Sequence, residues 1–284
     1  MTIAHVEPNH RKENIMSLRN KVVVVTGAGF PNGIGAGIAR CFAKENARVI
    51  ITDLKGSPID ETAAAIAGDV KGIIADASSQ QAMGEAADQI IKQYGCIDVL
   101  VNNAGVGDPQ PPVDLPETQL LKPDMTDQIW DMQLASNLRT TFASSVSVAP
   151  KMKDGGSIIN IASIAGLGPS VTLPAYGAAK AGVIHLTKTH ASQFAPRRIR
   201  VNCICPGLLW TRGWEMLTAM MKENDPNLAN VSQRQIFEGV VAQMTPLGGE
   251  QTPEDIGNLA VFFASDKARM ITGAVVAVDG GISL

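Results

Sequence analysis

Hydrophobic residues in this 284-residue chain gather in short runs separated by longer amphipathic stretches. A run that is apolar throughout suits a strand buried on both faces, as in a parallel sheet. The pattern predicts seven such strands: Val22–Thr26, Arg48–Asp53, Val70–Asp76, Ile97–Asn102, Gly156–Ser163, Arg200–Cys205 and Ala274–Asp279. It also predicts eight helices: Gly33–Asn46, Ile59–Ala67, Ser79–Tyr94, Thr126–Met152, Pro174–Phe194, Gly213–Lys222, Ser232–Met244 and Pro253–Ala264.

Strands that alternate with helices indicate the α/β class, with helices on both faces of a mostly parallel sheet. Right-handed crossovers favour the doubly wound, Rossmann-like order of seven strands. We expect one domain over residues 20–284. Residues 1–19 are polar and lack the apolar core of a signal peptide, so we expect a flexible tail, within which Met16 is an alternative start of translation.

Two segments interrupt the alternation. The stretch Val106–Pro123 contains five prolines and no helical period, which predicts a surface loop. The stretch 208–245 has helical pieces but is unusually apolar for a connection. We interpret it as a substrate lid. A surface helical pair packed on the core and an oligomer contact are the alternatives.

The first predicted strand runs into a glycine-rich turn and then a helix, in the sequence KVVVVTGAGFPNGIGAGI of residues 21–38. Glycines let a ligand approach the bare backbone, and the N–H groups of a helix N-terminus favour a phosphate. This order predicts a nucleotide pyrophosphate site, although the spacing is not the G-x-G-x-x-G of the Rossmann fingerprint. A turn that only packs helix against strand is the alternative.

Asp53 ends the second predicted strand, 20 residues after Gly33. A carboxylate there can accept from both ribose hydroxyls of an adenosine, and it would repel a 2′-phosphate. Neither Asn32 nor Leu54 offers a cation to that phosphate, so we expect NAD rather than NADP. A plain turn former is the alternative for Asp53. Asp76 either accepts from the adenine amino group or caps the following helix.

The composition narrows the classes of binding partner that we expect for this protein. The net charge of −3 gives no reason to expect nucleic acid or an anionic membrane, and no apolar run is long enough to span a bilayer. The four cysteines fit no zinc spacing, so we expect no metal site and a reducing, cytoplasmic location. Cys203 and Cys205 lie two apart in a predicted strand and should form a buried thiol pair.

Tyr176 and Lys180 are four residues apart in a predicted helix, so they share one face. Ser163 ends a predicted strand, which places its hydroxyl at the edge of the sheet where the glycine turn lies. Such a Tyr–Lys pair is usually a solvated helix face. With a serine and a cofactor turn beside it, the pair becomes a candidate catalytic set.

Residues 20–284 resemble the short-chain dehydrogenase/reductase family in its shorter, single-domain branch. The matching motifs are Thr26-Gly27 and Gly33-Ile34-Gly35 of the turn, Asn102-Asn103-Ala104-Gly105, Asn137, Ser163, Tyr176-x-x-x-Lys180, Pro206-Gly207 with Thr211, and Asp279-Gly280-Gly281. The resemblance implies hydride transfer between nicotinamide and a carbinol or carbonyl carbon. It also implies a homotetramer.

The resemblance assigns roles to particular residues. Tyr176 is the general acid/base, Ser163 holds the reacting oxygen, Lys180 lowers the pKa of the phenol and binds the nicotinamide ribose, and Asn137 supports a proton path. Trp210 and Trp214, with Ser163 and Tyr176, are expected to contact the substrate. The expected cofactor-binding residues are Gly27, Asn32, Gly33, Ile34, Asp53, Leu54, Asp76, Ala77, Asn103, Ala104, Gly105, Tyr176, Lys180, Pro206, Gly207, Leu209 and Thr211.

The chain departs from the family pattern at three places. Five residues separate Gly27 from Gly33, where the usual form has three, and this is similar to the enoyl-reductase branch. That branch has its lysine seven residues after the tyrosine, where this chain has Val183, so the carbonyl/alcohol branch matches better. The loop after Gly105 is longer than usual, and Thr140 stands where the family usually has glycine.

We therefore expect an NAD-dependent oxidoreductase that interconverts a secondary alcohol and a ketone. One alternative is a 3-oxoacyl reductase, for which Arg197, Arg198 and Arg200 would form a patch for an acyl carrier, unless they are only a solvated helix end. An alternative of another class is a nucleotide-sensing protein without turnover.

Overall fold

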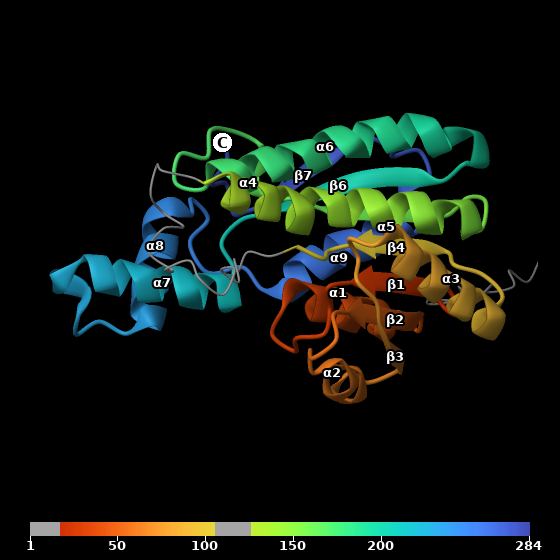
Figure 1. Cartoon of the computed structure of the whole chain (residues 1–284), viewed down its shortest axis with the longest axis horizontal. Coiled ribbons are helices and arrows are strands. Elements are labelled where there is room, and N and C mark those ends of the chain that lie inside the picture. Colours follow the sequence, from red (N-terminus) through yellow and green to blue (C-terminus); the bar gives the residue numbers. More distant parts are fainter. Residues whose placement is uncertain (1–17, 106–125) are drawn as a thin grey trace, which may run out of the picture.

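The seven strands form one sheet at the centre of the fold (Figure 1). This is a computed structural model, and it describes residues 18–105 and 126–284. The strand order is β3-β2-β1-β4-β5-β6-β7, and every neighbouring pair is parallel. The prediction of a doubly wound sheet is confirmed. The strands are β1 Val22–Thr26, β2 Arg48–Asp53, β3 Asp69–Ile74, β4 Val99–Asn102, β5 Ser157–Ile161, β6 Arg200–Pro206 and β7 Val275–Val278.

Helices cover both faces of the sheet. Helices α1, α2 and α9 pack on one face, and α3, α5 and α6 on the other (Figure 1). The helices are α1 Ile34–Lys44, α2 Ile59–Ala65, α3 Gln80–Tyr94, α4 Asp127–Leu134, α5 Thr140–Val148, α6 Pro174–Phe194, α7 Arg212–Asn224, α8 Gln233–Met244 and α9 Pro253–Ala264. No helix among the described residues is long and apolar enough to cross a membrane.

The consecutive valines of β1 contribute to both hydrophobic clusters of the core, one on each face of the sheet. Side chains of a strand alternate between its faces, so Val23 and Val25 pack under α1 and α9 while Val22 and Val24 pack under α3 and α5. All five residues of the strand are buried. A continuous apolar run therefore marks this interior strand correctly.

The start of β4 and the end of β5 differ from the prediction, and at each of them a polar side chain hydrogen-bonds to a backbone N–H. The strand expected from Ile97 begins at Val99, because the Asp98 carboxylate accepts from the N–H of Val22 at 2.9 Å. The strand expected to end at Ser163 ends at Ile161, because Ser163 caps a short 3₁₀ turn, η4 (Ile164–Gly166).

The helix predicted over Thr126–Met152 is interrupted. A five-residue π-helix, η2 (Ala135–Arg139), separates α4 from α5, and a 3₁₀ turn over Ala149–Lys151 ends the run. A π turn inserts one residue into a helix and rotates what precedes it, and such turns are frequent at functional sites. This one contains Asn137.

The described residues begin inside the expected tail. Leu18, which the sequence assigned to the tail, is 4% exposed and packs in the cluster under α1. The rest of the expected tail before Leu18 and the expected loop Val106–Pro123 lie outside the described residues.

The segment 208–245 forms the helical pair α7–α8, which lies beyond the carboxyl edge of the sheet (Figure 1). The two helices pack against each other and have a small hydrophobic cluster of their own, centred on the fully buried Phe237. The pair therefore packs mainly on itself, in contrast to the alternative of a pair packed on the sheet core.

Candidate active site

The glycine turn after β1 is joined to the end of β4 by a set of hydrogen bonds. The Thr26 hydroxyl accepts from the N–H groups of Asn103 and Ala104, at 3.1 and 3.0 Å. The Asn103 amide donates to the carbonyl oxygens of Thr26 and Gly27, at 3.0 and 2.8 Å. Gly27 has φ +64°, and a Cβ there would lie 2.5 Å from the Cα of Ala104, so only glycine permits this approach.

The turn delivers the chain into the N-terminus of α1. Gly33 is the N-cap residue, and within the described part of the chain no side-chain cap hydrogen bond is made at this helix start. The N–H of Gly33 itself donates to the carbonyl oxygen of Phe30 at 3.0 Å, which closes a tight turn over Phe30–Gly33. Unclaimed donors at a helix N-terminus fit a phosphate, so Asn32, Gly33 and Ile34 could hold a pyrophosphate.

Asp53 ends β2 directly beside the glycine turn. One carboxylate oxygen accepts from the N–H of Gly29 at 2.7 Å, and the other accepts from the N–H of Leu54 at 2.7 Å. A carboxylate has about four acceptor sites, so both oxygens keep capacity for ribose hydroxyls. The structure thus brings Asp53, Leu54 and the turn together as expected.

Asp76 follows β3, and one alternative predicted for it is wrong. It does not cap the following helix, because Ser79 is the N-cap of α3 and accepts from the N–H of Ala82 at 3.2 Å. The Asp76 carboxylate instead accepts from the N–H and the hydroxyl of Ser78, at 2.8 and 2.7 Å. The adjacent Ala77 is buried, and its carbonyl accepts from Ser144 at 3.2 Å.

Ser163 and Tyr176 meet at the carboxyl end of β5. The Ser163 hydroxyl caps η4, where it accepts from the N–H of Ala165 at 3.2 Å. Tyr176 lies in the first turn of α6, and its phenol is near enough to the Ser163 hydroxyl for that group to lower its pKa. A Cβ at Gly166 would lie 2.7 Å from the backbone of α6, so this glycine lets η4 press against the helix.

Lys180 lies one helical turn after Tyr176 and is only 4% exposed. Its ammonium is 5.6 Å from the centre of the Tyr176 ring and donates to the carbonyl oxygen of Ile161 at 3.2 Å. A Cβ at Gly105 would lie 2.8 Å from Oδ1 of Asn137 and 3.0 Å from Nζ of Lys180. The end of β4, the π-helix and α6 therefore converge on one point.

Burial shifts the ionisation of both members of the Tyr–Lys pair. It raises the pKa of Tyr176, and the hydrogen bond to Ser163 opposes part of that rise. Burial lowers the pKa of Lys180 from 10.5 to about 8, while the neighbouring Cys203 and Cys205 act to raise it. Below pH 8 the lysine therefore keeps the positive charge that favours a phenolate beside it.

The π-helix is held against the cofactor turn through Thr140. Its hydroxyl lies within hydrogen-bonding distance of the carbonyl oxygens of Ala104, at 2.9 Å, and Ser136, at 3.2 Å. Within the helix the Asn137 amide donates to Gln133 at 2.9 Å. Thr140 thus ties η2 to the end of β4. Gln133 was missed, although its spacing of four from Asn137 pointed to this contact.

The chain after β6 runs across the same edge of the sheet. The N–H of Gly207 donates to the carbonyl oxygen of Val278 at 3.0 Å, and a Cβ at Gly207 would lie 2.6 Å from Oε1 of Gln251. Leu209 is 2% exposed and pairs with Gln251 in an isolated bridge. Pro206 ends its strand opposite Val278 of β7, and Thr211 precedes the first residue of α7.

Trp210 and Trp214 pack inside the α7–α8 pair. Their rings lie 5.2 and 5.0 Å from the ring of Phe237. The Arg234 guanidinium lies over the Trp210 ring at 5.3 Å and over that of Phe237 at 5.5 Å. Their expected contact with substrate stays a prediction.

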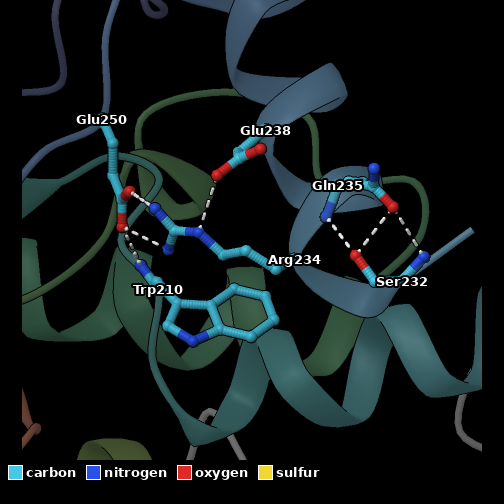
Figure 2. Close-up of polar contacts among 6 residues, drawn as sticks. All are labelled: Trp210, Ser232, Arg234, Gln235, Glu238 and Glu250. Carbon is cyan, nitrogen blue, oxygen red and sulfur yellow. Dashed lines mark hydrogen bonds and ion pairs between the residues drawn. The ribbon is translucent and has the colours of Figure 1, made fainter.

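Arg234 also joins α8 to the segment before α9 (Figure 2). Its guanidinium pairs with both oxygens of Glu250 and donates to Glu238 at 3.0 Å, and Glu250 also accepts from the N–H of Trp210 at 3.3 Å. A capping box of Ser232 and Gln235 starts the helix. Glu250 lies sixteen positions from Arg234 and forty from Trp210, so these contacts could not be found from the sequence, whereas the Arg234–Glu238 pairing and the capping box are local.

Cys203 and Cys205 are both free and fully buried, and they face Val183 of α6, which confirms the buried thiol pair. The pKa of Cys205 is raised by its hydrogen bond with Cys203 and by burial. Within residues 18–105 and 126–284 no group of side chains is arranged to hold a metal ion.

The arginines considered as an acyl-carrier patch lie elsewhere. Arg200 begins β6 at the amino edge of the sheet, the edge opposite Ser163, and donates to the carbonyl oxygen of Phe263 at 2.5 Å. Arg197 donates to Asp154 at 2.8 Å and to the carbonyl oxygen of Ala149 at 2.6 Å. Both side chains are hydrogen-bonded within the fold, away from Ser163, which does not favour the alternative of a patch for an acyl carrier.

Comparison with known proteins agrees with this architecture. A family model described as enoyl-(acyl carrier protein) reductase, from the short-chain dehydrogenase/reductase family, matches residues 27–283. The chain is 36% identical to a 7α-hydroxysteroid dehydrogenase of Bacteroides fragilis, over 93% of this chain and 95% of the relative. It is 32% identical to a 3-oxoacyl-[acyl-carrier-protein] reductase of Thermotoga maritima, over 94% of this chain and 99% of the relative.

Solved structures repeat the same fold. A short-chain dehydrogenase/reductase from Burkholderia xenovorans superposes with a TM-score of 0.78 at 33% identity, covering 94% of this chain and 98% of that one. The L-sorbose reductase of Gluconobacter frateurii, in complex with NADPH and L-sorbose, superposes with a TM-score of 0.81 at 26% identity, covering 95% and 98%. With Ser163, Tyr176 and Lys180 gathered at the end of a doubly wound sheet, the chain belongs to the short-chain dehydrogenase/reductase family.

Proposed function

We propose that this protein is an NAD-dependent oxidoreductase that interconverts a secondary alcohol and a ketone. The observation that carries the proposal is the convergence of Ser163, Tyr176 and Lys180 beside the glycine turn. When bound, the nicotinamide coenzyme would supply or accept the hydride. The chain's own residues would orient the reacting oxygen and move its proton.

Tyr176 is the proposed general acid/base. A free tyrosine has a pKa of about 10, so a phenolate near pH 7 needs about 4 kcal/mol of stabilisation. A cation 4 Å away supplies about 1 kcal/mol in bulk water and about 4 kcal/mol at an effective dielectric of 20. Lys180 therefore suffices only where water is largely excluded, and the pair α7–α8 is the proposed lid that excludes it.

Ser163 would hydrogen-bond the substrate oxygen and hold it beside the Tyr176 phenol. Lys180 would donate to the nicotinamide ribose, and Asn137 would support proton exchange with solvent through the π-helix. Trp210 and Trp214 would form part of the lid's apolar wall. Each of these roles is proposed from the site's geometry together with membership of the family.

The proposed preference for NAD rests on Asp53. Its carboxylate lies against the glycine turn through the N–H of Gly29, where the adenosine ribose would lie if the turn holds the pyrophosphate. A 2′-phosphate would meet that negative charge. The L-sorbose reductase neighbour is in complex with NADPH, so coenzyme preference needs a direct test.

Carbonyl chemistry is favoured over enoyl reduction by the position of the lysine. Val183, seven residues after Tyr176, is fully buried against Cys203 and Cys205, whereas the Lys180 ammonium lies 5.6 Å from the centre of the Tyr176 ring. A 3-oxoacyl reductase remains the second candidate because one relative carries that activity. We also expect a homotetramer, as the family resemblance implies, and a reducing, cytoplasmic location, as the cysteine usage indicates.

The experiment is a substrate screen with purified protein. Hydroxysteroids, ketoses, 3-oxoacyl thioesters and simple secondary alcohols or ketones are offered with each coenzyme in its oxidised or reduced form, and absorbance at the reduced nicotinamide band is followed. We expect turnover of an alcohol or ketone, faster with NAD than with NADP. Binding of NADH without turnover of any compound would instead favour a nucleotide-sensing protein.

A further inference from the structure

The glycine turn is two residues longer than the family's usual form, and we call this extra length the insertion. Arg40 supports the insertion from one side. Arg40 of α1 donates to the carbonyl oxygen of Pro31 at 2.9 Å, and the same guanidinium pairs with Glu254 of α9 at 2.6 Å. The Phe30–Gly33 turn closes the other end of the insertion. The insertion is therefore a supported projection of the turn.

The projection presents an exposed aromatic ring to the helical pair. Phe30 is 45% exposed. The Arg212 guanidinium lies 5.7 Å from the centre of its ring. Arg212 is the first residue of α7, so this contact joins the cofactor turn to the helical pair across 182 positions of sequence.

The distribution of charge around the turn points to a role for this contact in phosphate binding. A dinucleotide pyrophosphate is dianionic, and residues 27–34 of the turn contain no lysine or arginine. The nearby Arg40 already serves Glu254 and Pro31. Arg212 brings a cation to the turn through Phe30, and a guanidinium matches phosphate oxygens in charge and in geometry.

We propose that Arg212 binds the pyrophosphate of the coenzyme and that Phe30 holds its guanidinium at the glycine turn. The inference rests on the proposed function, because it requires that a dinucleotide binds there. It assigns a use to the insertion, which the family's shorter turn lacks. It also makes the helical pair part of the coenzyme site, so coenzyme binding would favour the position of α7 seen here.

The test measures coenzyme binding and needs no substrate. NADH is titrated into the wild type, R212Q and K222Q, with the fluorescence of the reduced nicotinamide as the signal. K222Q is the matched control, because it removes one positive charge from the same helix. Lys222 lies about 15 Å from Arg212 along the helix axis. We expect the Kd of R212Q to rise about tenfold at low salt and that of K222Q to match the wild type.

Three further measurements separate a phosphate contact from a structural one. ADP-ribose, which has the pyrophosphate without nicotinamide, should lose as much affinity as NADH in R212Q, whereas adenosine should lose none. The difference between wild type and R212Q should shrink at high salt, because an exposed charge pair is screened. R212K should recover part of the affinity, and F30L should weaken NADH binding in the wild type but not in the R212Q background.

The outcomes are distinguishable. Equal affinity of wild type and R212Q for NADH would overturn this inference and leave the proposed function standing. An equal loss for adenosine and ADP-ribose would also overturn it, because the effect would then be structural. Failure of the wild type to bind either coenzyme would overturn the proposed function, and this inference with it.

Discussion

The side-chain amide of Asn160 donates a hydrogen bond to the Thr187 hydroxyl across 2.9 Å, joining β5 to the helix that carries Tyr176 and Lys180. Both residues are fully buried. The same Asn160 accepts from Asn102 of β4 at 2.8 Å. A buried polar chain thus runs from the strand that leads into the cofactor loop to the proposed catalytic helix.

Thr187→Val should destabilise the protein. The valine fills the space but leaves the Asn160 amide without this acceptor, which costs about 1–3 kcal/mol of unfolding free energy. Thr189→Val is the control, because Thr189 lies on the same helix but is exposed. Urea unfolding of both variants checks the expectation, and equal stabilities would contradict it.

Tyr176→Phe should abolish turnover while NADH binding is kept. The phenol is the proposed proton donor and acceptor, and removing such a group lowers the rate about 10²–10⁴-fold. Tyr94→Phe is the matched control, since Tyr94 is the only other tyrosine and lies at the end of α3. Near-normal turnover by the Tyr176 variant would remove Tyr176 from its role.

The rate of alcohol oxidation should rise with pH through the alkaline range. Oxidation needs the phenolate of Tyr176, and burial raises the pKa of that phenol. Reduction needs the protonated phenol and should fall over the same range. Initial rates in both directions as a function of pH test this, and parallel profiles would contradict it.

Lys180→Met should stabilise the protein at pH 7, with a gain that shrinks at high pH. Burial lowers the folded-state pKa of Lys180 from 10.5 to about 8. Between these values the unfolded chain binds more protons, so this group's penalty of about 3 kcal/mol is full below pH 8 and relieved as the pH rises toward 10.5. Thermal melts across this range test the sign, with the exposed Lys188→Met as the control.

Asp53→Ser should shift coenzyme preference from NAD toward NADP. Removing the carboxylate removes its repulsion of the 2′-phosphate and its acceptance from the ribose, so the ratio of kcat/KM values should fall about 10- to 100-fold. Asp69→Ser is the control, because Asp69 begins β3 at the opposite edge of the sheet. An unchanged ratio in the Asp53 variant would argue against the proposed ribose contact.

Arg234→Gln should loosen the start of α8. The guanidinium is partly exposed, so each ion pair is worth well under 1 kcal/mol, but it also covers two aromatic rings. We expect faster hydrogen exchange at α8 amides, and a smaller change in Glu238→Gln, which loses only one pairing. Unchanged exchange in Arg234→Gln would show that Glu250 does not anchor the helical pair.

The sheet could be predicted because its signal is local. The valines of β1 and the apolar runs of β2 and β5 are buried on both faces, and a continuous run of such residues records that burial directly. The proximity of Ser163, Tyr176 and Lys180 was not local. It followed from the order of strands and helices and from the family's motifs.

The features that escaped prediction depend on contacts between distant segments. The π-helix adds one residue to a helix whose apolar pattern continues on both sides, and Thr140 meets Ala104 only in three dimensions. Asp76 and Ser79 were both suitable caps by residue type, and only the path of the chain decides for Ser79. The contact of Phe30 with Arg212 has no local signal at all.

In the all-parallel sheet, the proposed active site lies at the carboxyl edge of the strands, and the amino edge carries none of the proposed site residues. Every helix-to-strand connection returns to the amino edge, about 15 Å from the proposed site across the five residues of β1. There Gly95 and Gly155 turn the chain at φ +83° and +81°, with open space where a side chain would begin. Tags, fluorophores or inserted peptides placed at these two turns would leave the coenzyme and substrate surfaces untouched, which makes them natural attachment points for immobilising the enzyme.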